Sequence, residues 1–172
     1  MATEMPDGFL IMARHDLIRS DIDIPFRFVR KPMSLPPELR PDWKISILLL
    51  ILEISSHQGK SSLRRLHMLN WSMRSTSFKR DLEDRLKTPV PLFRLSVRFE
   101  PAFSRAIDLA VGRDLVEWVG GNRLKITSRG KTWVAAIQKD ALLMVDEKQF
   151  LRNLGKSITE KLAEEMFGHK GS

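Results

Sequence analysis

The 172-residue chain contains no cysteine. This absence excludes disulfides, thiolate chemistry and cysteine-ligated zinc sites, and it is typical of a reducing, intracellular setting. The longest apolar run, Ile45 to Ile54, contains Ser46 and Glu53 and is too short to span a bilayer. The amino terminus also lacks the basic-then-apolar order of a signal peptide. We therefore expect a cytoplasmic protein with no membrane partner.

Patterns of catalytic residues are equally scarce. The four histidines are scattered along the chain, and no two of them have the spacing of metal ligands. Gly-Lys followed by Ser or Thr occurs at residues 59–61, 130–132 and 155–157, but no glycine lies five positions before any of these pairs. A phosphate-binding loop needs that glycine because its backbone amides must approach the phosphates closely. We expect no enzymatic activity, no cofactor and no metal.

The charge of the chain, by contrast, is distinctive. A composition of 42% hydrophobic and 29% charged residues is ordinary for a soluble domain with one core. The net charge of +8 favours an anionic partner, with nucleic acid the first candidate. Residues 1–40 carry as many acids as bases, and the basic excess lies between Lys44 and Lys139. The middle of the chain is therefore the part expected to face an anion.

Residues 103–126 read as a helix followed by a hairpin. Apolar side chains recur at spacings of three and four from Phe103 to Val111, which predicts a helix ended by Gly112. The β-rich runs Leu115–Val119 and Leu124–Ile126 are joined by Gly-Gly-Asn, residues that accept the positive φ of a short turn. Helix followed by hairpin is the order of a winged helix, with the hairpin as the wing.

A further helix is expected directly after the hairpin. Thr127 or Ser128 can cap its amino terminus. Its Trp133, Val134 and Ile137 are expected to turn inward.

Helices are also predicted before this unit. One should start near Asp42 as N-cap and end by Gly59, and its nearly continuous apolar sequence predicts the central core helix. Ser61 can cap a second helix that ends near Arg74, and Ser75 or Ser77 a third at residues 78–86. Alternating apolar and basic residues over 93–99 predict a strand with a basic outer face.

The remaining segments complete the predicted architecture. Five prolines between residues 25 and 41 predict an extended arm over residues 1–41. Residues 141–172 should form a helical extension, with a helix at 146–154 ended by Gly155 and a capping box at Ser157–Glu160. The fold class is thus α+β, mostly α, with a winged helix-turn-helix domain at residues 42–140.

The basic residues of the wing suit phosphate better than bases. The helix before the hairpin offers Arg105 beside Asp108, a poor set for reading base edges. We therefore expect contact with the DNA backbone, independent of sequence, and the alternative is that the charges only keep the chain soluble. The candidate phosphate-binding residues are Arg113, Arg123, Lys125, Arg129 and Lys131.

The helix expected at residues 61–74 carries more apolar surface than one face requires. Met68 and Trp71 widen the stripe formed by its leucines. Either the helix packs on two sides of its own fold, or Trp71 is the centre of a surface for a protein partner. We predict the partner surface, with help from the last helix. Its residues would be Met68, Trp71, Ile158, Leu162 and Met166.

Two segments, LRRLHMLNWSMRS and LVEWVGGNRLKITSRG, carry a resemblance to a known family. With the preceding apolar helix they resemble the small middle components of bacterial ABC-three-component, Lamassu-type anti-phage systems. The resemblance covers residues 42–138 and is most specific at Leu66–Ser75. It implies a non-enzymatic accessory subunit in defence against phages and plasmids, held with an SMC-like ABC ATPase and an effector, often a nuclease. It supplies no catalytic residues.

Two other functions fit the same sequence. A free-standing winged-helix transcription regulator would dimerise through its terminal helices, and an antitoxin-like chain would inhibit a nuclease. A neighbouring gene for an ATPase favours the accessory subunit, whereas a palindromic operator upstream of the chain's own gene favours the regulator.

Overall fold

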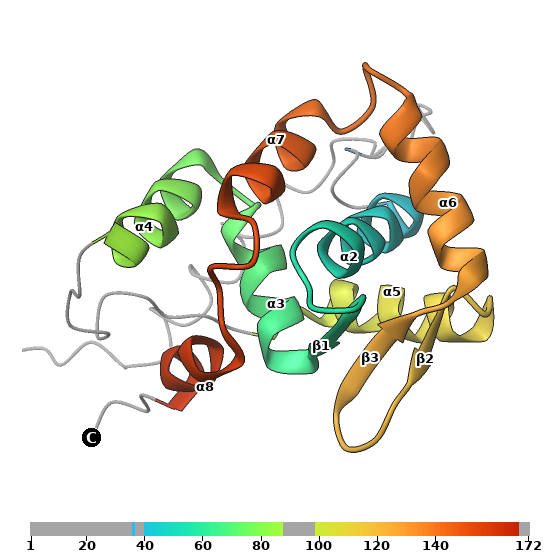
Figure 1. Cartoon of the computed structure of the whole chain (residues 1–172), viewed down its shortest axis with the longest axis horizontal. Coiled ribbons are helices and arrows are strands. Elements are labelled where there is room, and N and C mark those ends of the chain that lie inside the picture. The colour runs from blue at the N-terminus through green and yellow to red at the C-terminus, as the bar shows by residue number, and fades with distance from the viewer. Residues whose placement is uncertain (1–35, 37–39, 88–98, 169–172) are drawn as a thin grey trace, which may run out of the picture. The chain divides into compact units, whose positions relative to one another are not determined.

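The computed structural model describes residue 36 and residues 40–87 and 99–168 (Figure 1). All of them belong to one of the two compact units of the chain, Leu35–Ser172. Most of the expected arm at residues 1–41 and the expected strand up to residue 98 lie outside the described residues.

The described part is mostly helical with a small antiparallel sheet, so the α+β, mostly α class is confirmed. The hairpin and the helices on either side of it lie where their sequence places them. In chain order the described elements are α2 (Pro41–Ile54), β1 (Lys60–Ser62), α3 (Leu63–Ser72), α4 (Thr76–Lys87), α5 (Pro101–Gly112), β2 (Val116–Trp118), β3 (Arg123–Ile126), α6 (Ser128–Lys139), α7 (Val145–Leu154) and α8 (Glu160–Gly168).

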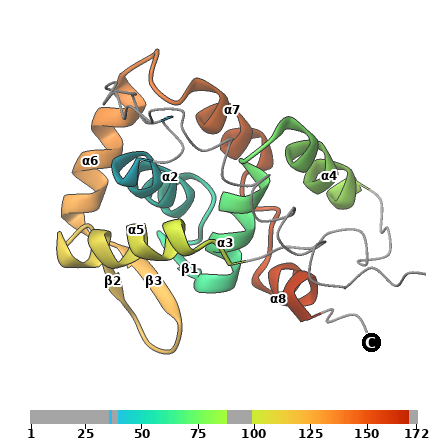
Figure 2. The same ribbon diagram turned by 180° about the vertical axis from the view of Figure 1, so that it is seen from behind.

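Helix α2 is the central element, as its sequence predicts. Every residue from Lys44 to Leu52 is buried, because α3, α5, α6 and α7 all pack against this helix (Figures 1 and 2). Its predicted N-cap was wrong: Arg40 is the N-cap and Asp42 lies in the first turn. Pro41 explains the shift, since its fixed φ and missing N–H suit the first helical position. The helix ends at Ile54, before Gly59 as predicted, and the chain then turns into β1.

Strand β1 was not expected from the sequence. It pairs antiparallel with β3, which pairs with β2, so the sheet order is β1-β3-β2. Leu124 and Ile126 of β3 are buried, and Arg123 and Lys125 alternate with them on the outer face. The N-cap of α3 is accordingly Ser62 instead of Ser61, and the Ser62 hydroxyl accepts a 3.2 Å hydrogen bond from the Arg65 amide.

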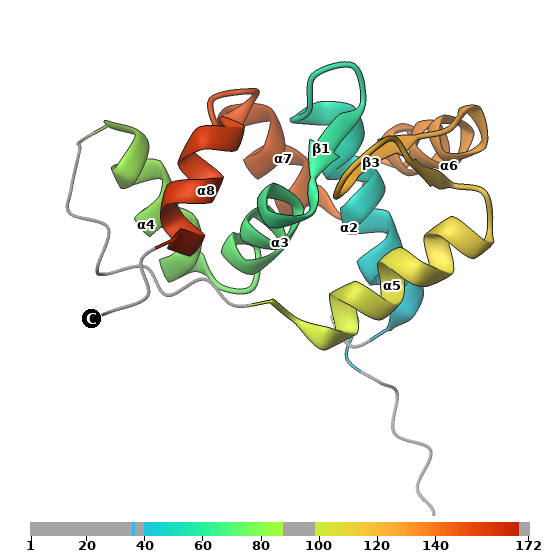
Figure 3. The same ribbon diagram turned by 90° about the horizontal axis from the view of Figure 1, so that it is seen from below.

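Helix α3 is covered on several sides by its own fold. It contacts α2, α4 and α8 (Figure 3). Arg64 is its one exposed residue. Trp71 is only 7% exposed and stacks on Phe78 of α4 with 4.3 Å between ring centroids. Met68 is fully buried. The prediction of a partner surface centred on Trp71 was therefore wrong, and the intramolecular alternative holds: α4 supplies the aromatic ring that covers this side chain.

The end of the chain differs from expectation in its capping. Gly155 ends α7 with a φ of 55°, as predicted. The capping box at Ser157–Glu160 was wrong, because Thr159 instead accepts a 3.1 Å hydrogen bond from the Leu162 amide at the start of α8. Ile158 and Met166, predicted to face a partner, are buried against the core, and Leu162 is half-buried. Helices α7 and α8 are thus integrated with α2 and α3.

Helix lengths also bear on the membrane question. Within residues 40–87 and 99–168, no helix combines the length and apolar character required to cross a bilayer.

Candidate anion-binding pocket

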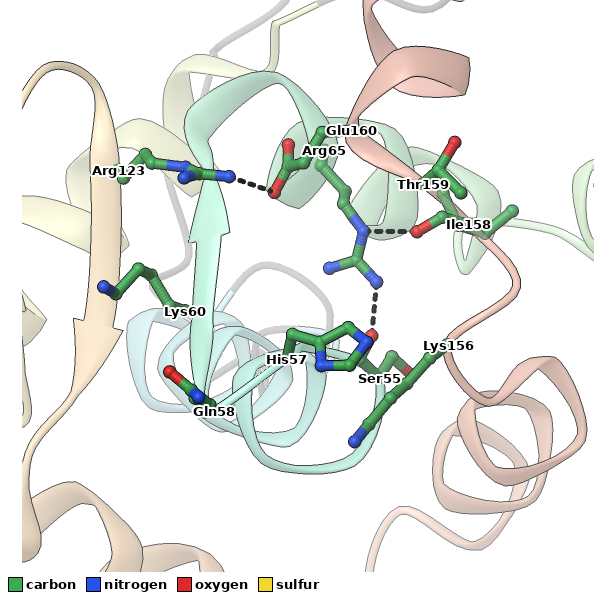
Figure 4. Close-up of a pocket in the computed structure, with 10 residues that line it drawn as sticks. All are labelled: Ser55, His57, Gln58, Lys60, Arg65, Arg123, Lys156, Ile158, Thr159 and Glu160. Carbon is green, nitrogen blue, oxygen red and sulfur yellow. Dashed lines mark hydrogen bonds and ion pairs between the residues drawn. The ribbon is translucent and has the colours of Figure 1, made fainter.

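A pocket of about 420 Å³ opens where the α2–β1 turn, the sheet and the α7–α8 connection meet (Figure 4). Its volume is within the range typical of small-ligand sites. Most of its lining side chains are polar, and four are cationic. The lining residues are Ser55, His57, Gln58, Lys60, Arg65, Arg123, Lys156, Ile158, Thr159 and Glu160.

Two of the three Gly-Lys-Ser/Thr tripeptides meet at this pocket. Lys60 and Lys156 both line it, although 96 positions separate them in the chain. Figure 4 shows Lys60 and Arg123 on the sheet side, and Lys156 and Thr159 on the side of the α7–α8 connection. The tripeptides do not form a phosphate-binding loop, because the Lys60 and Ser157 amides already donate to the carbonyls of His57 and Leu154. These two amides are therefore not free to bind an anion, whereas the side chains of Lys60 and Lys156 line the pocket.

A tight turn presents the first of these lysines. Gln58 and Gly59 have φ values of 53° and 66°, the pair of positive angles that a type I′ turn requires. A Cβ on Gly59 would lie 2.5 Å from Cγ2 of Ile126, so only glycine fits against β3. The Ile126 amide donates to the Gly59 carbonyl at 2.9 Å. The turn therefore fixes Lys60 at the edge of the sheet.

Arg65 forms the floor of the pocket and joins its two walls. Its side chain is buried, with Nε donating to the Ile158 carbonyl at 2.7 Å. One terminal nitrogen donates to the hydroxyls of Ser56 and Ser61 at 2.9 and 3.0 Å, and the other to the Ser55 carbonyl. Burial lowers the pKa of the guanidinium, and the nearby charge of Glu160 opposes that shift. The four acceptors are uncharged, so Arg65 also adds positive potential to the pocket.

The strand register extends this positive surface across the sheet. Lys60 pairs with Lys125, and Ser62 with Arg123, so all four side chains lie on the outer face. Glu117 pairs with Lys125 from the other side, and their charged groups lie 3.8 Å apart. Glu117 offsets part of the charge of Lys125, but three cations and one acid leave this face of the sheet with a net positive charge.

Glu160 is the single acid in the pocket. One carboxylate oxygen accepts the Ser62 amide at 3.0 Å and lies 3.7 Å from Arg123. Because Arg123 and Glu160 are both partly exposed, this ion pair is weak and a polyanion can compete with it.

The one histidine of the pocket lies at its rim. His57 is exposed, and its backbone, not its ring, pairs with Lys60. Among the residues that the structure describes, no group of three His, Asp or Glu side chains is placed to hold a metal ion. The chemistry that this arrangement supports is electrostatic binding of an anion.

The predicted phosphate-binding residues divide into two sets. Arg123 lines the pocket and Lys125 shares its sheet face. Arg113 instead pairs with Asp42 at 3.1 Å, in the first turn of α2. The pocket lies beyond the other end of that helix, which has 14 residues and is therefore about 20 Å long. Arg129 and Lys131 are exposed on α6 and do not line the pocket.

A second polar cluster lies between α2, α3 and the start of α5, and its contacts are structural. Lys44 and the Asn70 side chain donate to the Glu100 carboxylate at 2.9 and 2.7 Å. Burial raises the pKa of Glu100, but these two hydrogen bonds, together with the charges of Lys44 and Arg74, outweigh it and the net shift is downward. Burial lowers the pKa of His67 to about 4, against the charge of Glu100, so this histidine is neutral at pH 7. The cluster ties three helices together.

Sequence reasoning did not single out Lys60, Arg65 or Lys156 as functional. Two of the three Gly-Lys-Ser/Thr tripeptides contain Lys60 and Lys156, but the third, at residues 130–132, lies on α6 outside the pocket. The repeated tripeptides were visible in the sequence, but nothing in the sequence indicates which of them lie together in the fold.

The chain was compared with protein-family models, curated proteins and solved structures. No family model, curated protein or solved structure matches it. The geometry of the site therefore carries the functional conclusion.

Proposed function

We propose that the chain is a non-catalytic winged-helix subunit that holds the backbone of double-stranded DNA on its basic sheet face. The single observation that carries this proposal is the convergence of Lys60, Arg123 and Lys156 around one pocket, with Lys125 beside them on the same sheet face. These groups are donors and positive charges without base-reading geometry, so they suit phosphate.

The order of the elements supports the winged-helix part of the proposal. Helix α2, strand β1, helices α3 and α5 and the hairpin β2–β3 follow one another as in that fold, with α4 inserted before α5. The sheet order β1-β3-β2, with the hairpin beside the short first strand, also supports it. The helix that would enter a major groove, α5, exposes Arg105, Asp108 and Leu109. This surface is too poor in hydrogen-bonding side chains to select a base sequence.

The assembly part of the proposal rests on the resemblance of residues 42–138 to the small middle components of Lamassu-type defence systems. In that setting the chain is a cytoplasmic accessory subunit of an SMC-like ATPase and joins the ATPase to an effector nuclease. A basic face that binds any duplex suits a subunit of an ATPase that acts on DNA without regard to sequence. Co-expression with the neighbouring gene products and mass measurement of the purified complex test this part.

DNA binding is tested by fluorescence anisotropy with random duplexes of about 25 base pairs at several salt concentrations. Binding should be weak, equal for unrelated sequences and steeply dependent on salt. The triple variant Lys60→Ala, Arg123→Ala, Lys156→Ala should lower the affinity for every duplex and flatten the log–log salt slope by about 2 to 3.

The matched control removes three exposed cations outside the pocket: Arg113→Ala, Lys131→Ala and Lys139→Ala. It has the same net charge as the pocket triple, so an equal loss of affinity would show that only total charge matters. Strong preference for one operator at physiological salt would instead favour the transcription regulator.

A further inference from the structure

The surface around the α6–α7 connection is apolar and exposed. Leu142 is 89% exposed, Val145 50%, Leu143 40% and Trp133 36%. Adjacent large apolar side chains at a protein surface mark interaction sites far more often than isolated ones do. None of these residues lines the basic pocket, so this surface is independent of the proposed DNA contact.

A groove runs along α6 beside these side chains. Its volume is about 530 Å³. The lining residues from α6 are separated alternately by three positions and by one, so they lie on one face over three turns of the helix. From Arg129 to Asp140 this face is about 16 Å long. Ala136 lies between the larger side chains and leaves room for close approach of another helix. The lining residues are Arg129, Thr132, Trp133, Ala136, Ile137, Asp140 and Leu143.

The connection that carries Leu142 and Leu143 is held by hydrogen bonds from both sides. The Asp140 carboxylate accepts their backbone amides at 2.9 and 3.2 Å. Lys148 is buried, and its amino group donates to the carbonyls of Ile137 and Asp140 at 3.3 and 2.6 Å. Because these hydrogen bonds restrain the loop, we expect binding to it to lose little conformational entropy.

The charges around the groove specify the partner further. Arg129 lines the groove, and Lys139, next to Asp140 on the same helix, is exposed at its edge. The one acid in the groove, Asp140, already accepts two amides with its Oδ1 oxygen. The complementary surface is an apolar stripe with acidic flanks.

We propose that this groove binds an amphipathic helix of a partner protein, with apolar residues at i, i+3 or i+4 and i+7 and with Asp or Glu beside them. Its length matches three turns of helix, which is the usual form of helix-in-groove recognition. The partner helix lies along α6 and packs its apolar residues against Trp133, Ala136 and Leu143.

A displayed library of randomised helical peptides, selected on the full chain, tests this proposal directly. Selection should enrich apolar stripes with acidic flanks. A synthetic peptide of the enriched sequence should bind the Ala136→Arg variant at least about tenfold more weakly, because the new side chain fills the groove. Ala135→Arg is the matched control, since Ala135 is exposed on the same helix outside the groove. Its affinity should change less than about twofold.

Three results would overturn the proposal. The first is enrichment of basic flanks or of no helical pattern, and the second is equal binding to the two arginine variants. The third is a different occupant of the groove. A concentration-dependent dimer would indicate a second copy of the chain, and intramolecular cross-links at Lys139 would indicate a segment of the same chain. Either signal would have to be lost in Ala136→Arg and kept in Ala135→Arg.

Discussion

Helices α3 and α6 each carry one tryptophan, and the structure treats the two side chains in opposite ways. Trp71 of α3 was expected to face a partner and is buried against Phe78, whereas Trp133 of α6 was expected to turn inward and is 36% exposed. Val134 and Ile137 of α6 are buried as predicted. A side chain's place on an apolar stripe therefore does not tell which neighbouring element covers it. The outer side of α3, away from α2, is covered by α4 and α8.

The polar residues of the two helices differ in the same way. Helix α3 buries Arg65, His67 and Asn70, each of them hydrogen-bonded to another part of the fold. Exposed polar residues on α6, by contrast, alternate with its buried face. Substitutions in α3 should thus cost more stability than equivalent substitutions in α6.

The largest difference is expected between the tryptophans. Trp71→Ala should lower the free energy of unfolding by roughly 3–5 kcal/mol, because it empties a closed site in the core. Trp133→Ala should lower it by less than about 1 kcal/mol, since a partly exposed side chain leaves no closed cavity. Urea denaturation of both variants measures this difference. Equal losses would contradict the division between a covered α3 and an exposed α6.

The next largest effect concerns neighbouring arginines on α3. Arg65→Met should cost roughly 3 kcal/mol, because it leaves two carbonyls and two serine hydroxyls at the pocket floor without their donor. Arg64→Met, at the exposed neighbouring position, should change stability by about 0.5 kcal/mol or less. The measurement is again chemical denaturation. Comparable losses of stability in both variants would show that Arg65 does not link the pocket walls.

A pH effect of intermediate size should come from His67. Its pKa is about 4 in the fold, below the ordinary 6.5, so the unfolded chain binds a proton at a higher pH than the folded chain does. Stability is complete above pH 6.5 and is lost as pH falls, by roughly 2 kcal/mol at pH 4.5. Glu100, whose pKa is also lowered, adds a further loss below its ordinary value of 4.5.

The control for this effect is His67→Gln. Unfolding free energies of the native chain and the variant between about pH 7.5 and 4.5 should diverge at high pH and approach each other at low pH. A native chain whose stability is flat over that range would show that His67 accepts a proton without penalty in the fold.

The smallest predicted effect is a cap on α6. The Thr127 hydroxyl accepts the Gly130 amide at 3.1 Å and donates to the Asp114 carbonyl. Thr127→Ala should therefore cost about 1 kcal/mol. Thr132→Ala makes the same chemical change on the exposed side of α6, where it should cost less than half as much. A thermal-melting comparison of the two variants is sufficient, and a larger loss for Thr132 would contradict the capping role.

Prediction from sequence was most accurate where the signal is local. The hairpin β2–β3, the Thr127 cap and the Gly155 stop all depend on residues within a few positions of one another. Strand β1 escaped prediction because three residues, Lys60–Ser62, carry no apolar alternation of their own. They form a strand because β3 offers a partner edge.

The sequence by itself determined the class of the fold, the central place of α2 and the excess of basic side chains, since composition and short-range periodicity encode all three. Only the tertiary structure decided where those properties act. Burial of Trp71 depends on a ring from α4, and the pocket depends on a turn that brings Lys60 to a connection carrying Lys156. Contacts between residues far apart in the chain leave no periodic pattern, because each depends on how whole elements pack.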